Sequence, residues 1–263
     1  MKISANGIQM NYVLEGPANA PMVTMSHSLA TDLSMWDPQA KALAGRYRVL
    51  RYDTRGHGGT DAPGSPYTLT QLADDARALL KALGIARTHW IGLSMGGMIG
   101  QTLALSSPEI FQSLSLCDTS SRIPADMKHV WDERIATVEA KGMELMVEPT
   151  IARWFTPEFI ESHKDVIEPV RAMIRRTPAK GYIGCCHAIR ALDLTDRLKA
   201  IALPTLVIVG AQDMGTPLAA SQTINQQIKG SELVVLDPAS HLSNLEQPEA
   251  FTKALEQFLK RAA

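Results

Sequence analysis

One short segment is the most informative about the fold: Trp90-Ile91-Gly92-Leu93-Ser94-Met95-Gly96-Gly97-Met98. Its first four residues form an apolar run typical of a buried strand, and the residues after Ser94 are typical of a helix that ends before Pro108. A serine between two glycines at a strand-to-helix turn is the pattern of a nucleophile elbow, because so sharp a turn leaves little room for a Cβ on either side. The helix N-terminus would also place positive partial charge beside Ser94. The alternative is an ordinary serine in a glycine-rich turn.

The elements around this turn predict a mostly parallel sheet that is flanked by helices. Apolar runs alternate with helical patterns in the first two-thirds and the last quarter of the chain. An opening hairpin is expected over 2–4 and 9–15, with its turn at Asn6-Gly7. Further strands are expected at 22–27, 48–53, 88–94, 113–119, 204–210 and 232–237.

Two helices stand out by the spacing of their apolar residues. The first follows a capping box of Thr68 and Gln71 and stops at Gly84. The second is the last helix of the chain, in which Glu246 and Glu249 stand near the start, as the helix macrodipole prefers. Its apolar stripe consists of Phe251, Leu255, Phe258 and Leu259.

Residues 122–190 interrupt this alternation and contain no good strand. The composition predicts several short helices, separated by Pro149, Pro157, Pro169 and Pro178. We therefore expect a helical lid over 122–190, inserted after the sixth strand of a core that comprises 1–121 and 191–263.

Composition excludes several classes of protein. A length of 263 residues fits one α/β domain with a modest insertion. The net charge of −1 shows no basic excess for nucleic acid, and no run approaches the roughly 18 apolar residues of a membrane span. The first residues contain no apolar signal-peptide core, and three cysteines are too few for a disulfide framework. We expect a cytoplasmic protein whose partner is a small molecule; the sequence does not determine its oligomeric state.

A serine nucleophile needs a histidine base and an acid that orients the base, in the chain order Ser, Asp or Glu, His. Among the histidines after Ser94, His241 is favoured because it lies between the last strand and the last helix. The others, His129, His163 and His187, fall in the lid. For the acid, Asp213 follows a buried strand and is favoured. Asp118, which follows the preceding strand, competes with it, and the order rule alone does not separate the two.

Two backbone N–H groups are expected to form the oxyanion hole, those of Met95 and Leu29. Met95 follows the nucleophile, and Leu29 lies in the loop after the first parallel strand. The alternative for Leu29 is a plain strand exit. His57 precedes the nucleophile and is expected to cap the loop after the second parallel strand.

With these candidates in place, the whole chain resembles the α/β-hydrolases, and more closely the 3-oxoadipate enol-lactonases of the β-ketoadipate pathway. The matching segments span nearly the full length and include the lid, where substrate choice usually lies. At Ala30 the chain departs from the glycine that family members usually carry after His-Ser-Leu. The segments that carry the resemblance are 27–29, 31–37, 51–58, 92–97, 153–157, 181–186 and 240–248.

The resemblance implies an α/β-hydrolase fold and a carboxylic ester hydrolase that opens an enol-lactone bearing a side-chain carboxylate, giving 3-oxoadipate in aromatic-compound catabolism. It implies an acyl-enzyme on Ser94, then attack by water that His241 activates. It implies neither a metal nor an organic cofactor, in agreement with the absence of an H-E-x-x-H motif and of metal-ligand spacing in Cys185-Cys186-His187.

The lid is expected to recognise the substrate. Trp131 and Trp154 are candidates for the apolar wall of the pocket, or else they anchor the lid to the core. Of the lid arginines we expect one or two to point inward, because a buried substrate carboxylate without a partner would be costly. The arginines are Arg122, Arg134, Arg153, Arg171, Arg175, Arg176 and Arg190.

The sequence is also compatible with other functions. A general carboxylesterase, another lactonase or a hydrolase of C–C bonds would use the same three residues. A haloalkane dehalogenase is disfavoured, since it needs an aspartate where Ser94 stands. A small-molecule receptor could share the fold, although an intact, ordered triad argues against a purely binding role.

Overall fold

The computed structural model describes residues 1–262, and its centre is an eight-stranded sheet in the order β1-β2-β4-β3-β5-β6-β7-β8. The first two strands form an antiparallel hairpin, β2 pairs antiparallel with β4, and the remaining neighbours are parallel. The strands are β1 (Lys2–Ala5), β2 (Ile8–Glu15), β3 (Met22–Ser26), β4 (Arg48–Tyr52), β5 (Thr88–Leu93), β6 (Phe111–Cys117), β7 (Thr205–Gly210) and β8 (Glu232–Leu236).

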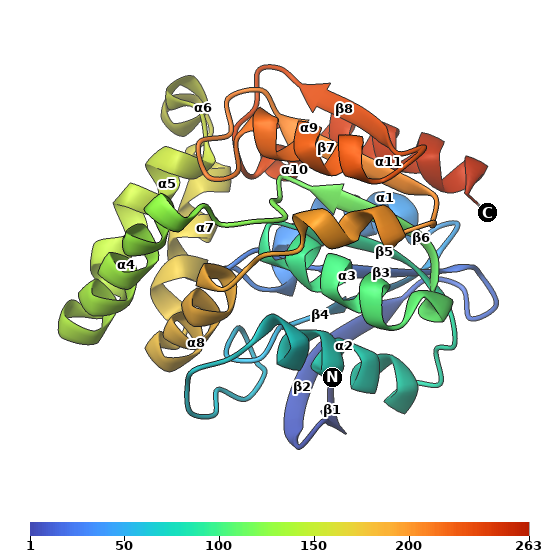
Figure 1. Ribbon diagram of the computed structural model, residues 1–263, viewed down its shortest axis with the longest axis horizontal. Coiled ribbons are helices and arrows are strands. Elements are labelled where there is room, and N and C mark those ends of the chain that lie inside the picture. The colour runs from blue at the N-terminus through green and yellow to red at the C-terminus, as the bar shows by residue number, and fades with distance from the viewer. Residues whose placement is uncertain (263) are drawn as a thin grey trace.

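Helices cover both faces of this sheet (Figure 1). The nucleophile helix α3 packs on β3, β5 and β6, with α2 beside it, and α9 packs on β7 and β8. On the other face, α1 packs on β4 and contacts α11. The helices are α1 (Asp37–Leu43), α2 (Leu69–Ala82), α3 (Met95–Ser106), α4 (Lys128–Lys141), α5 (Val147–Trp154), α6 (Pro157–Ser162), α7 (Lys164–Arg176), α8 (Ala179–Arg190), α9 (Leu218–Gln227), α10 (Ser243–Glu246) and α11 (Pro248–Arg261).

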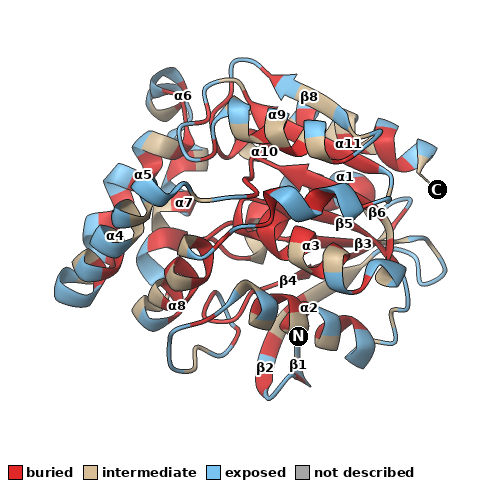
Figure 2. Cartoon of the chain, viewed as in Figure 1, coloured by how far each residue is buried: buried red, intermediate tan, exposed pale blue. Residues whose placement is uncertain are grey.

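The expected mostly parallel α/β fold is thus confirmed, and burial explains its sequence pattern. Every residue of β5 and of β7 is buried, as central parallel strands covered on both faces require (Figure 2). The hairpin turns at Asn6 and Gly7, both with positive φ. Thr68 caps α2 by accepting a hydrogen bond from the N–H of Gln71. The apolar stripe expected in the last helix is buried in α11.

Helices α4 to α8 lie between β6 and β7 and gather at one end of the sheet (Figure 1). Two of the four prolines do not separate helices, contrary to expectation. Pro149 lies in the first turn of α5, where a backbone N–H would have no partner within the helix. Pro169 lies inside α7. Here packing overrides the local preference, because Ile167, Val170 and Ile174 of α7 are all buried. The division into a core and a separate lid stays a prediction.

The parallel arrangement positions the candidate site. The ends of β3, β5, β6, β7 and β8 are all carboxyl ends, and they meet at one edge of the sheet. In open α/β sheets, ligands bind outside this edge. The segments that begin at His27, Ser94, Asp118, Ala211 and Asp237 all start here. Among residues 1–262, no helix is long and apolar enough to cross a bilayer.

Candidate active site

Ser94 stands at a strained turn between β5 and α3. Its φ of 53° and ψ of −114° place a non-glycine residue in the left-handed region. The flanking glycines explain how the turn closes. A Cβ on Gly92 would lie 2.2 Å from the carbonyl oxygen of Gly96, and one on Gly96 would lie 2.1 Å from that of Ser26. The close approach that G-x-S-x-G predicts is therefore real, and either glycine-to-alanine change would push the backbone apart.

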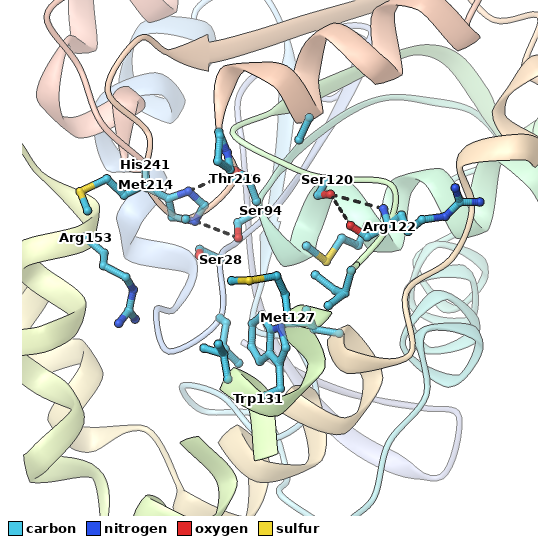
Figure 3. Close-up of a pocket in the computed structure, with 18 of the residues that line it drawn as sticks. Ser28, Ser94, Ser120, Arg122, Met127, Trp131, Arg153, Met214, Thr216 and His241 are labelled. Atoms are coloured by element: carbon cyan, nitrogen blue, oxygen red, sulfur yellow. Dashed lines mark hydrogen bonds between the residues drawn. The ribbon is translucent and has the colours of Figure 1, made fainter. Parts of the chain in front are cut away.

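The structure brings Ser94, His241 and Asp213 together in one chain of hydrogen bonds. The Oγ of Ser94 lies 2.9 Å from Nε2 of His241 (Figure 3). On the other side of the ring, Nδ1 lies 2.9 and 3.0 Å from the two carboxylate oxygens of Asp213. The Nδ1–H group can donate to the carboxylate, so Nε2 is left free to accept the serine proton. All three side chains are buried.

The carboxylate of Asp213 is held as an anion. It accepts hydrogen bonds from the N–H of Gly215 at 2.7 Å and from the N–H and Oγ1 of Thr216 at 2.9 and 2.7 Å. Burial acts to raise the pKa of Asp213, but the neighbouring His241 and these hydrogen bonds lower the pKa below its ordinary value. A charged carboxylate can fix the imidazole ring and stabilise its protonated form.

Asp118, the competing acid, lies elsewhere. Its carboxyl group accepts a hydrogen bond from the N–H of Gly210 at 2.8 Å and lies 2.6 Å from the hydroxyl of Ser243. No hydrogen bond joins it to His241 among residues 1–262. Burial and the nearby Asp213 raise the pKa of Asp118 well above its usual range. The geometry therefore favours Asp213 as the orienting acid.

The two expected oxyanion donors are the backbone N–H groups of Met95, which directly follows Ser94, and of Leu29. Met95 is the first residue of α3, and Leu29 lines the cavity in the loop after β3. Within residues 1–262, neither backbone N–H donates to an acceptor. Both donors are thus available to a substrate oxygen, as an oxyanion hole requires.

Two buried histidines connect this loop to the segment after β4. Nε2 of His57 accepts a hydrogen bond from the N–H of Ala30 at 3.0 Å, and Nε2 of His27 accepts one from the N–H of Thr54 at 2.8 Å. Their Nδ1 atoms lie 3.2 and 2.7 Å from the carbonyl oxygens of Arg55 and Ser28. Nδ1 must therefore carry the only ring proton of each histidine.

Both rings are consequently neutral. Burial, with the neighbouring His27, lowers the pKa of His57 to about 3, and burial also lowers the pKa of His27. His57 was expected to cap its own loop; the structure shows that it also holds the Leu29 loop across the site. Ala30 has a φ of 60°, a strained value for a residue with a Cβ, and its N–H bond to His57 helps to maintain it.

A cavity of about 760 Å³ opens above Ser94 between the sheet edge and the lid helices. Both tryptophans predicted for the pocket line it. The indole of Trp154 stacks on His241, with 6.1 Å between ring centroids, so it also covers one face of the imidazole ring. Trp131 is partly buried, and the guanidinium of Arg134 lies 4.5 Å above its ring. Their roles in binding stay predictions.

The lid arginines fall into two groups. Five form ion pairs with carboxylates, and of these only Arg122 also lines the cavity: Arg122 with Asp193 and Asp196, Arg171 with Glu148 and Glu168, Arg175 with Glu144, Arg176 with Asp32, and Arg190 with Asp132. The other two, Arg134 and Arg153, line the cavity, and no carboxylate of residues 1–262 forms an ion pair with either.

Arg153 is the more confined of these two cations. Its Nη2 donates to Oγ1 of Thr150 at 3.3 Å, a long hydrogen bond to a neutral partner. Burial and the nearby Arg134 lower the pKa of Arg153 to about 10. A cation that is disfavoured in this way gains most from an incoming anion. The expectation of one or two inward arginines agrees with this arrangement, which the sequence could not assign to particular residues.

Sequence reasoning missed the role of Glu246. It was expected to favour the start of the last helix, but it belongs to the short α10 and is buried. Its carboxylate accepts hydrogen bonds from the N–H of Ser240 at 2.8 Å and from the N–H of Thr156 at 3.0 Å. Ser240 precedes His241, and Thr156 belongs to the lid. Glu246 thus joins the base-bearing loop to the lid, a contact between segments too distant in sequence for any local pattern to show.

No metal site is found within residues 1–262, since no three His, Cys, Asp or Glu side chains gather there. The three cysteines are free and buried. Burial raises the pKa of Cys185 and Cys186, so both thiols stay neutral and serve as packing residues.

Comparisons with known proteins identify the family of the chain. Residues 21–248 match the family described as the alpha/beta hydrolase fold. A curated relative, 3-oxoadipate enol-lactonase 2 from Acinetobacter baylyi, is 39% identical over 98% of this chain and 96% of its own length. The crystal structure of the enol-lactonase from Burkholderia xenovorans LB400 is 40% identical, with a TM-score of 0.96 over 99% of this chain and 100% of the other.

A structure of lower sequence identity has the same architecture. The structure of a thermophilic esterase from Thermogutta terrifontis is 29% identical and has a TM-score of 0.94, over 100% of this chain and 98% of the other. Fold alone does not fix a substrate, so this likeness is compatible with more than one ester or lactone. The chain therefore belongs to the α/β-hydrolase family and is a hydrolase of the ester or lactone type, similar in sequence and structure to the 3-oxoadipate enol-lactonases.

Proposed function

We propose that this chain is a serine hydrolase that opens 3-oxoadipate enol-lactone to 3-oxoadipate in aromatic-compound catabolism. The observation that carries the proposal is a single cavity that contains both the Ser94–His241 pair and the unpaired cation of Arg153. The first supplies acyl transfer, and the second supplies a partner for the substrate carboxylate. The cytoplasmic location and the pathway stay predictions.

The reaction begins with attack of Ser94 Oγ on the lactone carbonyl, while Nε2 of His241 accepts the serine proton. Negative charge develops on the carbonyl oxygen and is stabilised by the N–H groups of Leu29 and Met95. The ring C–O bond then breaks, and the imidazolium gives its proton to the departing enol oxygen. The enol becomes the ketone of the product while the acyl group remains on Ser94.

Water completes the cycle. His241 accepts a proton from water as the oxygen attacks the acyl-enzyme, and the proton then returns to Ser94 Oγ. Asp213 remains charged throughout and stabilises the protonated ring. The arrangement needs no further reactant, since hydrolysis consumes only water.

The position of Arg153 supports this particular lactone. Arg153 adjoins Trp154, which stacks on His241, and the carbonyl oxygen of Arg153 accepts a hydrogen bond from Ser240 Oγ at 3.1 Å. In Figure 3 the side chain of Arg153 lies on the same side of Ser94 as His241, which is the side where the leaving oxygen must be. In the enol-lactone, the carbon that bears the leaving oxygen also bears the carboxymethyl group. A carboxylate on the leaving-group side therefore matches a cation on the histidine side.

The test compares kcat/KM for the enol-lactone acid with kcat/KM for its neutral methyl ester. We expect the acid to be preferred by about tenfold or more, since an ion pair in a confined site contributes on the order of 1.5–3 kcal/mol. Arg153→Met should abolish this preference while it leaves a simple aryl acetate nearly unaffected. Arg175→Met is the matched control, because Arg175 pairs with Glu144 on the surface.

Equal kcat/KM values for acid and ester in the unmodified enzyme would overturn the anionic substrate and favour a general carboxylesterase. A receptor without catalysis is tested separately with p-nitrophenyl acetate. Turnover that Ser94→Ala abolishes would exclude the receptor, whereas no turnover of any ester or lactone would favour it.

A further inference from the structure

The cavity extends in a direction that the enol-lactone does not need. On the side of Ser94 opposite Arg153, Ser120 and Arg122 follow β6, and Met127 and Trp131 of the lid lie below Ser94 in the same view (Figure 3). We define the acyl arm as the part of the cavity lined by Ile123, Pro124, Met127, Val130, Ala220 and Thr223. The total of about 760 Å³ lies high in the range of roughly 300–1,000 Å³ that is usual for drug-sized ligands. A monocyclic lactone with a short acid side chain fills only part of it.

The polar groups around the acyl arm are already satisfied within the protein. The hydroxyl of Ser120 donates to the carbonyl oxygen of Arg122 at 2.8 Å, and that of Ser121 lies 2.7 Å from Oγ1 of Thr195. Thr223 donates to the carbonyl oxygen of Ala219 at 2.9 Å.

The charge of Arg122 is also neutralised within the protein. The guanidinium of Arg122 turns away from the cavity and pairs with Asp193 and Asp196 (Figure 3). The six residues that define the arm therefore offer an incoming group apolar surface and no free hydrogen-bonding side chain. Arg134, which has no carboxylate partner among residues 1–262, lies over the ring of Trp131. An apolar occupant would gain from burial in the arm, and a polar one would lose its water without compensation.

The geometry of the tetrahedral intermediate assigns this arm to the acyl side. The former carbonyl carbon has four substituents, and the site assigns a place to three of them. Ser94 Oγ is one, the oxyanion facing Leu29 and Met95 is the second, and the leaving oxygen beside His241 is the third. The fourth substituent is the acyl chain. Because Arg153 flanks the His241 side, the acyl chain is left with the arm that extends away from Arg153.

We infer a second activity, the hydrolysis of esters between an apolar, medium-chain carboxylic acid and a short hydroxy carboxylate. Arg153 would bind the carboxylate of the alcohol portion, and the acyl arm would hold the hydrocarbon chain. Ser94 takes the acyl group and the ester C–O bond breaks, the hydroxy acid leaves with the proton that His241 received, and water releases the fatty acid. The inference rests on the acyl-enzyme and on the anion recognition of the proposed function.

The experiment measures kcat/KM for O-acylglycolates with acetyl, butanoyl, hexanoyl and octanoyl chains, for their neutral methyl esters, and for the enol-lactone. We expect kcat/KM to rise by about threefold for each added methylene group until the arm is full, as burial of hydrocarbon predicts. The free carboxylates should be preferred over the methyl esters, and Arg153→Met should remove that preference at every chain length.

Two variants test the arm itself. Met127→Asn should flatten the dependence on chain length, because it removes an apolar wall. Leu145→Asn is its matched control: the two side chains are 48% and 49% exposed, both belong to the lid, and Leu145 does not line the cavity. Leu145→Asn should leave the dependence of kcat/KM on chain length unchanged. Ile123→Trp, which fills the arm, should shift the best substrate to a shorter chain, and it provides a second reading if Met127→Asn unfolds.

Each outcome separates the two proposals. A flat or falling dependence on chain length, with the enol-lactone still opened, would overturn the second activity alone. A rising dependence without preference for the carboxylate would overturn hydroxy acids as the alcohol portion. If the acylglycolates are hydrolysed with both features and the enol-lactone is not, the proposed function fails and the second activity stands.

Discussion

The carboxyl edge of the sheet and the lid face the same cavity, but they satisfy their polar groups differently. At the sheet edge the functional side chains are joined in one hydrogen-bonded chain, in which Asp213 is held by Gly215, Thr216 and His241 and His241 contacts Ser94. In the lid, Trp131 and Trp154 supply broad apolar faces, and Arg153 is a cation whose side chain has only a long bond to Thr150.

This difference separates reaction from recognition. Groups that move a proton must be fixed to within a fraction of an ångström, and a dense hydrogen-bond network does this. A group that binds an anion must keep its charge available, so a partner within the protein would compete with the substrate. We infer that changes at the sheet edge lower kcat for every substrate, whereas changes in the lid alter the choice among substrates.

The largest effects are expected at the reacting pair. Ser94→Ala and His241→Ala should each lower kcat by several orders of magnitude with the fold retained, as circular dichroism and thermal unfolding would check. Residues that act as a unit are not additive, so the double variant should be little slower than either single one. Rate losses that multiplied would mean that the two residues act in independent steps.

The next largest effect separates the two candidate acids. Asp213→Asn should lower kcat by about 10³- to 10⁴-fold, because the amide favours the wrong histidine tautomer and cannot stabilise the imidazolium. Asp118→Asn should cost less than about tenfold, since its raised pKa favours a neutral side chain already and an amide keeps its bonds to Gly210 and Ser243. If steady-state kinetics instead showed the larger loss of kcat for Asp118→Asn, the orienting acid would be Asp118, which follows β6.

A smaller effect is expected at His57, which touches no reacting atom. His57→Phe leaves the N–H of Ala30 without its acceptor and should loosen the Leu29 loop. We expect kcat to fall by about 10- to 100-fold, less than the loss of an oxyanion donor outright, with KM nearly unchanged. Binding of a boronic acid that mimics the tetrahedral intermediate should weaken in parallel. A change in KM alone would show that the loop acts in substrate binding instead.

His57 also predicts a dependence of stability on pH. The folded protein holds this ring neutral, with a pKa of about 3, while the unfolded chain takes up a proton near 6.5. Stability should therefore decrease as the pH falls below about 6.5, by about 2 kcal/mol at about pH 5 from this group alone. Urea unfolding across this range should show a shallower decrease for His57→Phe than for the unmodified protein. Equal slopes would mean that the ring is protonated in the folded state.

The smallest effect is expected on the outer surface of the lid. Arg175 and Glu144 are about half exposed or more, and exposed ion pairs contribute little because water screens them. Arg175→Met should leave the midpoint of thermal unfolding and kcat/KM for the lactone acid within experimental error. A loss of activity at Arg175 as large as at Arg153 would contradict the division of the lid arginines into paired and available groups.

The secondary-structure elements and the order of the site residues along the chain can be predicted without the tertiary structure. The G-x-S-x-G turn, the alternation of strands and helices, and the positions of Asp213 and His241 after strands are local patterns. Local sterics and periodicity therefore suffice to predict them. Parallel strands then bring such residues to one edge, so Ser94 and His241 could be expected to meet although 147 positions separate them.

The roles of chemically equivalent side chains, in contrast, depend on how distant segments pack together. Asp118 and Asp213 both follow strands, and only the packing of the loops places one of them against His241. The lid arginines look alike in sequence, and their partners lie up to 144 positions away, as for Arg176 and Asp32. Whether an arginine is neutralised or left facing the cavity depends on these distant contacts, which no local pattern encodes. For the same reason, the part of Glu246 in joining the lid to the His241 loop became visible only in the folded chain.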